Sequence, residues 1–422
     1  MSFRNQIPNI ITPKSLPQLP VKQLAFGKLS EYHFLEKEES LLRITLQFEC
    51  GKIHESKLGL NEACVQLLLS GNEKMSAHSI QEKLDQFGAF IELEGGLRSS
   101  YIQVFCLKEY AEKVLDILAE VLDTLSFVED EIRIYKNRVQ ENLKVKEQKT
   151  SFLAKRAFKG HIFGTNTVYG SSILSTDIES INQSDLIEHF NTKFKHSLFR
   201  IFTNTYIPEH QLKSLEKFSR ETIATPFTWN GIYPEQHEIH LPKADAVQAT
   251  LISGFISAGR KEETYPARSF LSTVLGGYFG SRLMKNIREE KGFTYGIHSA
   301  YTNYPDLALF QISSDVKNEV RDEALAEIRK EIKRLQTELI DNSELETVRN
   351  YMLGSLQRAF DGSLNLMDRY KTLLDLGLPM NYFQEYVDSI LELNANYLQE
   401  IASIEFDAKR FYTVVAGNFD TA

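Results

Sequence analysis

Two kinds of hydrophobic pattern alternate along this chain, and they occur in the same order in each half. Apolar residues at every second position predict strands over 42–48, 100–107 and 199–203. Apolar residues at helical spacing predict helices over 59–70 and 76–87, and longer amphipathic helices over 109–125 and 129–155. The first half is therefore expected to combine one sheet with several helices.

The second half repeats this order. Strands are expected over 250–255, 307–313 and 412–416, and helices over 265–275, 281–290, 322–339 and 343–360. A repeat of about 200 residues indicates a duplicated domain and not a solenoid. The predicted fold class is α+β, with two homologous domains that each have a mostly antiparallel sheet and helices packed on one face.

Proline marks the expected boundary between the two halves. The segment 206–242 contains Pro208, Pro226, Pro234 and Pro242 together with Trp229, and it is predicted to be the linker region. We expect an N-terminal domain over 1–220 and a C-terminal domain over 235–422.

The composition restricts the function classes. With 42% hydrophobic and 25% charged residues, the 422-residue chain is typical of globular proteins. A net charge of −9 argues against nucleic-acid binding and against an anionic membrane surface. No apolar run is long enough to span a membrane, and no secretory signal is visible. The three cysteines, Cys50, Cys64 and Cys106, form no disulfide framework, so a reducing cytoplasm is the expected location.

One stretch of the second half contains a specific combination of residues. It comprises Gln248, the run Leu275-Gly-Gly277, the run Ser281-Arg-Leu283, Arg288, Gly292 and Tyr295. Together these positions resemble the second-half signature of the M16 (insulinase, pitrilysin and mitochondrial-processing-peptidase-like) zinc peptidases. The resemblance extends over about residues 42–416, and it implies two homologous domains that enclose a cleft.

The resemblance implies a role for two of these residues. In this family the Arg and Tyr hold the substrate opposite a zinc ion, and Arg288 and Tyr295 stand at those positions. A guanidinium and a phenol can both donate hydrogen bonds to a substrate carbonyl or to the oxyanion that develops from it. Without the family, Arg288 would be interpreted as part of a solvated helix end and Tyr295 as a half-buried strand residue.

The first half resembles the same family but lacks the metal ligands. Active members carry His-x-x-Glu-His on a helix and a further Glu, which hold zinc and supply the general base. The frame of that motif is present as Gly59-Leu60-Asn61, Gly71, Ser76-Ala77, Ile80, Leu84-Asp85 and Gly88-Ala89. This frame assigns Glu62, Val65 and Gln66 to the motif and Asn142 to the last ligand, so no metal is expected in this chain.

Other constellations are weaker candidates. His237 and His240 form the sole His-x-x-His, but in an extended stretch their side chains point to opposite faces. His78 is expected on a solvated helix face. Gly276-Gly277 before a helix could bind an anion, although no nucleotide-binding motif accompanies it. Cys64 would be the nucleophile of a different hydrolase class, but the sequence places no His beside it.

Two hypotheses remain for the function. In the first, the chain is the non-catalytic, substrate-binding subunit of a bacterial heterodimeric M16-type metalloendopeptidase. It would donate Arg288 and Tyr295 to a homologous partner that carries His-x-x-Glu-His and the zinc, and it would bind an unfolded peptide along a strand edge. In the second, it is an inert homodimeric peptide-binding or scaffold protein of the same fold.

Overall fold

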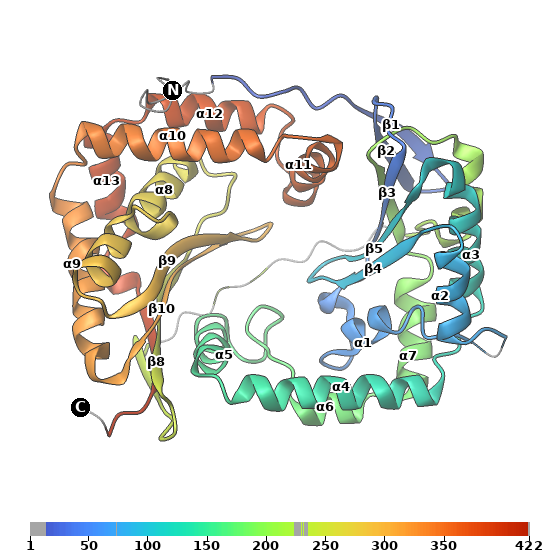
Figure 1. Cartoon of the computed structure of the whole chain (residues 1–422), viewed down its shortest axis with the longest axis horizontal. Coiled ribbons are helices and arrows are strands. Elements are labelled where there is room, and N and C mark those ends of the chain that lie inside the picture. The colour runs from blue at the N-terminus through green and yellow to red at the C-terminus, as the bar shows by residue number, and fades with distance from the viewer. Residues whose placement is uncertain (1–13, 73, 223–228, 230, 232–234, 421–422) are drawn as a thin grey trace, which may run out of the picture. The chain divides into compact units, whose positions relative to one another are not determined.

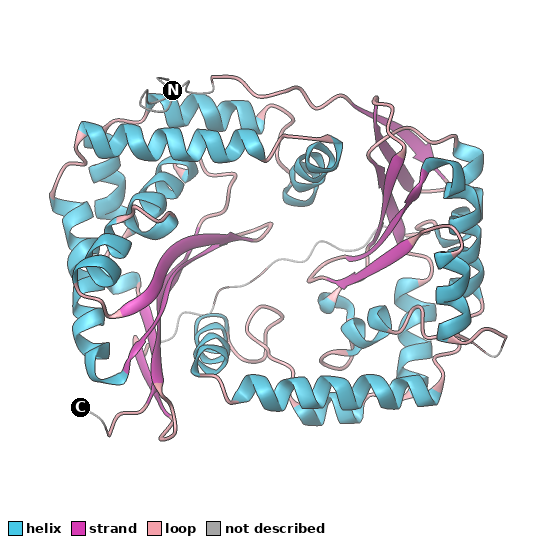
Figure 2. Cartoon of the chain, in the orientation of Figure 1, coloured by secondary structure: helices cyan, strands magenta, loops and turns pink. Residues whose placement is uncertain are grey.

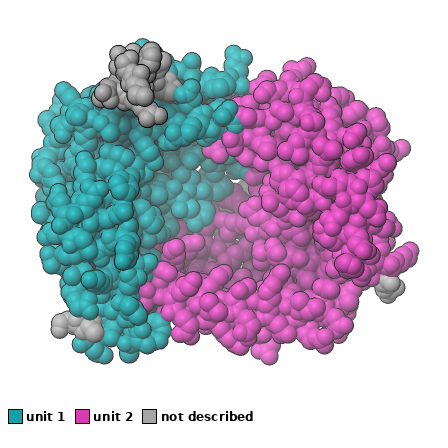
Figure 3. Space-filling model, viewed as in Figure 1, with its two compact units in different colours: residues 1–18, 235–361, 372–422 teal, residues 19–234, 362–371 magenta. Residues whose placement is uncertain are grey.

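The computed structural model describes residues 14–72, 74–222, 229, 231 and 235–420. The chain divides into two units, each with its own sheet (Figures 1 and 3). Unit 2 contains residues 19–234 and 362–371, and unit 1 contains residues 1–18, 235–361 and 372–422. Each unit is described separately below.

The sheet of unit 2 has the strand order β1-β2-β6-β3-β5-β4. Neighbouring strands are antiparallel except β2 and β6, which are parallel. The strands are β1 (Val21–Phe26), β2 (Ser30–Leu35), β3 (Leu41–Phe48), β4 (Phe90–Gly95), β5 (Ser100–Leu107) and β6 (Leu198–Thr203). β4 is therefore an edge strand of this sheet.

The sheet of unit 1 has the order β7-β11-β8-β10-β9, and again one neighbouring pair, β7 and β11, is parallel. The strands are β7 (Glu238–Pro242), β8 (Gln248–Ser257), β9 (Thr294–Asn303), β10 (Ala308–Lys317) and β11 (Tyr412–Gly417). The five-strand order matches β2-β6-β3-β5-β4 of unit 2 in sequence order and in strand direction. β9 is thus the counterpart of β4, and the α+β fold of two similar domains is confirmed.

The helices of unit 2 cover one face of its sheet (Figure 2). Alternate β3 residues, from Leu42 to Phe48, are buried in the core that the sheet forms with these helices. The helices are η2 (Lys52–His54), α1 (Leu60–Gln66), α2 (Ala77–Asp85), η3 (Lys108–Tyr110), α3 (Ala111–Asp123), α4 (Glu129–Glu147), α5 (Thr150–Phe163), α6 (Ser175–Ser180), α7 (Gln183–His189), η4 (Phe190–Phe194) and η5 (Glu209–Phe218).

Unit 1 has the same layering, with a core centred on Phe255 and Phe310 of the sheet. Two of its helical segments, η6 and η7, are π-helices. The helices are α8 (Tyr265–Ser272), η6 (Thr273–Gly277), η7 (Met284–Glu290), η8 (Asn318–Val320), α9 (Arg321–Thr337), α10 (Asn342–Arg358), α12 (Tyr382–Glu392), α13 (Ala395–Glu405) and η9 (Ala408–Arg410). One further helix, α11 (Ser363–Leu376), begins in unit 2 and ends in unit 1. Within the described residues, no helix has both the length and the apolar character that a bilayer crossing requires.

The predicted helix over 129–155 is wrong as a single element. The chain forms α4 and α5 instead, because Lys149 adopts an extended conformation (φ −93°, ψ 125°) and ends the helical path. Neither Pro nor Gly occurs between residues 147 and 150, so the sequence contained no breaker there.

The segments around the expected linker and domain boundaries are more ordered than the prolines suggested. η5 buries Leu212, Leu215 and Phe218 in the core of unit 2, and β7 is a strand of the second sheet. Both lie inside the expected linker 206–242, parts of which fall outside the described residues. Residues 362–371 belong to unit 2 although the rest of the helical region after residue 235 does not.

Side-chain contacts explain why this short segment joins unit 2. Asp368 receives two hydrogen bonds from the Arg43 guanidinium, at 2.6 and 3.1 Å, on the face of β3 opposite the core. The Tyr370 hydroxyl lies 3.0 Å from Nδ1 of the buried His33. The first turns of α11 thus lie against the sheet face that the other helices of unit 2 leave free.

Candidate functional site

The helix at the zinc-motif position, α1, serves mainly to fill the core. Leu60, Cys64 and Val65 are at most 1% exposed and pack against the sheet of unit 2. At its N-terminus, a Glu55 carboxylate oxygen accepts hydrogen bonds from the backbone N–H groups of Gly59 and Asn61, both at 3.1 Å. The N-terminus of α1 is therefore capped by the carboxylate of a residue that precedes the helix.

Glu62 and Gln66 lie one turn apart on the half-buried face of α1, so the structure brings two of the predicted positions together. Burial raises the pKa of the Glu62 carboxyl, while hydrogen bonds from Gln66 and from the Gly95 backbone oppose that shift. The Gln66 amide also donates to the Leu93 carbonyl at 3.2 Å. Both side chains are thus engaged in hydrogen bonds within the protein.

The remaining zinc-motif positions offer no donor set. Val65 is completely buried and has no polar atom, and Asn142 is an exposed residue of α4. Tyr135 of α4 is the residue whose phenol is affected by the charge of Glu62. Burial is the main cause of the raised pKa of Tyr135, and the Glu62 charge raises it further. Among the described residues, no group of three or more His, Cys, Asp or Glu side chains could hold a metal ion. These residues do not fit a catalytic zinc ion, because an imidazole pair and a base are both missing.

The isolated histidines are engaged in other contacts. His237 Nδ1 lies 3.0 Å from the Phe411 carbonyl, and its ring stacks on Tyr412. His240 Nε2 lies 2.8 Å from a Glu238 oxygen. His78 is exposed and lies 3.4 Å from Glu82, one turn further along α2. Of the His-x-x-His pair, His240 therefore lies in the edge strand β7 and His237 directly precedes it.

A buried Cys-His-Asn cluster in unit 2 was missed by the sequence reasoning. The Cys50 thiol lies 3.3 Å from Asn61 Oδ1 and 3.5 Å from His189 Nε2. Burial raises the pKa of Cys50 to about 12 and lowers that of His189 to about 4. Because a nucleophilic cysteine needs a lowered pKa and access to solvent, this cluster is structural. No local pattern could have found it, since 139 positions separate the cysteine from the histidine.

The other thiols are equally unsuited to catalysis. Cys64 is fully buried, and its pKa is raised well above the ordinary value by burial, with a contribution from Cys50. Burial raises the pKa of Cys106 to about 11. All three cysteines are free in the structure. The arrangement therefore offers no support for Cys64 as a nucleophile.

Arg288 lies near the end of η7, and a glycine on each side of this segment determines the path of the chain. At Gly276 an added Cβ would lie 2.7 Å from the Ser299 backbone nitrogen of β9, so only glycine allows this approach. Gly292, with φ +68°, follows the end of η7 and turns the chain into β9. The half-buried Arg288 guanidinium lies over the ring of Phe279, 4.7 Å from its centroid, and that ring is itself 64% exposed.

Tyr295 lies at an irregularity of the edge strand β9. The β9–β10 register pairs Ile297 with Ser314 but Thr294 with Val316, so two residues of β9 face one of β10. Such a bulge twists a strand and changes the direction of its side chains. Tyr295 is 90% exposed, more than any other large hydrophobic or aromatic residue of the described chain.

The bulge is held by hydroxyl groups. The Thr294 hydroxyl lies 2.6 Å from the Asp315 carbonyl and accepts a hydrogen bond from the Gly296 N–H at 3.1 Å. The Ser314 hydroxyl lies 3.0 Å from the Thr294 hydroxyl and equally close to the Gly296 carbonyl. The conformation of the local backbone therefore determines the exposed position of Tyr295.

Comparison with known proteins identifies both halves. The family model described as insulinase (peptidase family M16) matches residues 35–177, and that of the peptidase M16 inactive domain matches residues 208–352. The chain is similar to the "uncharacterized zinc protease YmxG" of Bacillus subtilis, with 25% identity over 86% of this chain and 88% of that protein. It is also similar to the "non-peptidase homolog YmxG" of Helicobacter pylori, with 24% identity over 82% and 81% of the two chains.

Two further comparisons concern a eukaryotic relative and a solved structure. A "probable mitochondrial-processing peptidase subunit beta" of Arabidopsis thaliana is 20% identical over 70% of this chain and 59% of that protein. The crystal structure of a peptidase M16 inactive domain from Pseudomonas fluorescens has the same fold, with a TM-score of 0.85, 18% identity, and coverage of 94% of this chain and 98% of that chain. The two family models, the duplicated fold and the residues at the motif positions show that this chain belongs to the M16 peptidase family as a member without the His-x-x-Glu-His zinc motif.

Proposed function

We propose that this chain is the non-catalytic, substrate-binding subunit of a heterodimeric M16-type zinc metalloendopeptidase. In this proposal Arg288 and Tyr295 act in the active site of a homologous partner, which supplies the zinc and the general base. The two side chains would donate hydrogen bonds to the substrate carbonyl and to the negative charge that develops on it.

One contrast carries this proposal. The position of the general base is occupied by Val65, which is completely buried, whereas Tyr295 is 90% exposed at a bulge of an edge strand. An exposed phenol on a twisted edge strand gains little for stability, so its exposure favours a role in contacting another molecule. Arg288 lies near the end of η7, the helical segment that precedes this strand, and it is only half-buried.

The edge strands support binding of an unfolded peptide. β4 is an edge strand of the six-stranded sheet, and Phe90 at its start is 50% exposed. An edge strand offers backbone N–H and C=O groups to an extended segment, which is how many domains recognise peptides. The peptide would be selected by its ability to extend, and unfolded segments meet that requirement.

Reconstitution tests the proposal. We expect a mixture of this chain with a His-x-x-Glu-His homologue from the same genome to cleave an unstructured peptide, while neither chain does so alone. Arg288→Ala and Tyr295→Phe should each lower kcat roughly 100- to 1,000-fold, as removal of an oxyanion donor does elsewhere. Full activity of both variants would reject the role of the pair.

Matched controls exist in the same unit. Arg329 is an exposed arginine whose guanidinium contacts Glu238, and Tyr397 is an exposed tyrosine of α13. Arg329→Ala and Tyr397→Phe should leave kcat within about twofold of the unsubstituted chain, since exposed side chains away from a site contribute little. A comparable loss of activity in the controls would show that the effect is general and not specific to the pair.

The second candidate function is an inert homodimeric peptide-binding or scaffold protein. The name of the Helicobacter pylori relative, "non-peptidase homolog", favours it. A stable homodimer in light scattering, with no zinc-bearing homologue bound and no gain of peptidase activity on mixing, would support this candidate over the first. The cytoplasmic location stays a prediction in either case.

A further inference from the structure

The helical segment that carries Arg288 is held from one side by a polar network. η7 is a π-helix, and π-helical hydrogen bonding is rare and mostly confined to single turns near functional sites. Its buried residues Met284 and Ile287 pack into the core of unit 1. A segment with this uncommon hydrogen-bond pattern depends on contacts with neighbouring helices to keep its orientation.

The first contact is an ion pair between the turn leading into η7 and the start of α10. The Arg282 guanidinium donates to Glu344 through Nε at 3.0 Å and through Nη2 at 2.6 Å, which is a two-pronged geometry. The two side chains are 9% and 16% exposed. Glu344 lies in the first turn of α10, where Asp341 caps the helix and the helix dipole favours a carboxylate.

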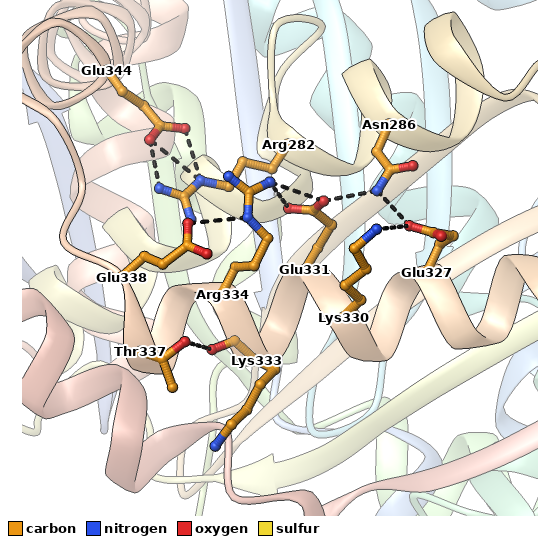
Figure 4. A network of polar contacts seen from close by, with 10 residues as sticks. All are labelled: Arg282, Asn286, Glu327, Lys330, Glu331, Lys333, Arg334, Thr337, Glu338 and Glu344. Carbon is orange, nitrogen blue, oxygen red and sulfur yellow. Dashed lines mark hydrogen bonds and ion pairs between the residues drawn. The ribbon is translucent and has the colours of Figure 1, made fainter.

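The second contact joins η7 to α9. The Asn286 amide nitrogen donates to a Glu327 oxygen and to a Glu331 oxygen, both at 2.8 Å (Figure 4). Glu331 is 1% exposed and also accepts two hydrogen bonds from Arg334, at 3.0 and 3.1 Å. The amide orientation is fixed, because the opposite orientation would direct its oxygen at two carboxylates.

A polar cavity of about 430 Å³ adjoins this face of η7. Arg282, Lys285 and Asn286 line it on one side, and residues of α9 and of the first turns of α10 line the other. Apolar packing is therefore incomplete here, and the polar contacts determine how η7 is oriented on α9 and α10. Loss of either contact would leave η7 with space to shift.

We propose that Arg282 and Asn286 are positioning residues, which fix η7 on α10 and α9 so that Arg288 is held ready for substrate. Arg288 follows Asn286 by two residues, so it lies on the opposite side of the helical segment. A rotation of η7 would carry the Arg288 guanidinium away from its place over Phe279. This inference rests on the proposed function of Arg288.

The first experiment measures η7 directly in the full chain. Hydrogen–deuterium exchange of the amides of residues 284–293 should be about tenfold faster in Arg282→Lys and in Asn286→Leu, because a charged hydrogen bond is lost in each. The matched control is Arg321→Lys, since Arg321 is also buried but donates to the carbonyls of Asn318 and Asn418. It should leave exchange in η7 unchanged. Unaltered exchange in both test variants would overturn the proposal.

The second experiment links the network to Arg288. In the reconstituted peptidase, kcat should fall roughly 10- to 100-fold in both test variants while KM changes less than about twofold, because a displaced catalytic group lowers the rate after binding. Loosened η7 exchange with unchanged kcat would overturn the link to Arg288. If even the unsubstituted chain gives no turnover with its partner, the proposed function fails, and the exchange experiment still decides whether Arg282 and Asn286 orient η7.

Discussion

Replacement of Asn286 by aspartate is the most demanding test of the network beneath η7. The two side chains have nearly the same shape, so the change replaces one hydrogen-bond donor group by a carboxylate and leaves the packing intact. The amide nitrogen donates to the Glu327 and Glu331 carboxylates, and its hydrogen bond is the main reason that the pKa of Glu327 lies below its usual range. An ionised aspartate in place of the amide would put a third negative charge against these two.

The magnitude follows from two competing costs. An ionised carboxylate about 4 Å from each of two others is destabilised by roughly 4 kcal/mol per neighbour at an effective dielectric constant of about 20. Binding a proton at pH 7 costs less, about 1.36 × (7 − 3.9), or roughly 4 kcal/mol in total. The new carboxyl therefore stays protonated in the folded state. It then donates one hydrogen bond where the amide donates two, which costs about 1.5 kcal/mol more.

We thus expect Asn286→Asp to lower the free energy of unfolding by about 5.5 kcal/mol at pH 7. Because its folded-state pKa lies above the unfolded value, the folded variant binds more protons, and its deficit grows with pH. From pH 7 to pH 5 the deficit should shrink by about 2.7 kcal/mol. Urea unfolding followed by far-ultraviolet circular dichroism measures this difference at each pH.

Asn286→Leu is the matched control, since it removes the same hydrogen bonds without adding a titratable group. Its cost should be about 1.5–3 kcal/mol, because Glu331 keeps Arg334 as a partner. This cost should change little between pH 5 and pH 7, because Glu327, whose pKa the amide lowers, titrates below that range. If the deficit of the aspartate variant were equal at pH 5 and pH 7, or no larger than that of the leucine variant, the bridging role of the amide would be refuted.

Three further outcomes are expected. The three cysteines, which burial keeps as neutral thiols, should resist an aromatic disulfide reagent in the native chain and all react after unfolding; rapid labelling of one of them would contradict its burial. Because the folded pKa of His189 is about 4 against 6.5, the stability it contributes should be complete above pH 6.5, and about 3 kcal/mol should be lost as pH falls to 4; His189→Gln should flatten that part of the stability–pH curve. Gly254→Ala should prevent folding of unit 1, since the added Cβ would lie 2.0 Å from the Phe310 carbonyl oxygen. Gly354→Ala, in the middle of α10 where an added Cβ meets no other atom, should instead raise stability by about 0.5–1 kcal/mol in thermal unfolding.

Hydrophobic periodicity was sufficient for the duplicated fold and insufficient for its details. The central strands and the long helices were predictable because their apolar residues recur at the spacing of one buried face, as in β3 and α3. The hydrogen-bond register within a helix has no such pattern. The predicted helices over 265–275 and 281–290 therefore exist, but their later parts are the π-helices η6 and η7.

Long-range contacts account for most of what the sequence could not indicate. The Cys50–His189 contact and the bonds from Arg43 to Asp368 join residues that the sequence separates by 139 and 325 positions. No local pattern encodes such pairs, so the fold must bring them together first. The segment 362–371 consequently joins the unit formed by the first half of the chain.

The two halves of this chain differ in how far their local structure departs from regular, well-packed helices and strands. At the zinc-motif position, Val65 fills the core and Glu62 and Gln66 form hydrogen bonds with each other, so α1 is an ordinary structural helix. The first half also contains one π-helix, η4, but in the second half two π-helices, a close glycine approach, a bulge and a 90% exposed Tyr295 occur together within about 30 residues. Substitutions that remove destabilising features are easy to find. Such features are therefore retained where function requires them. The proposed role of Arg288 and Tyr295 is therefore to be tested in the η7–β9 region and not in α1.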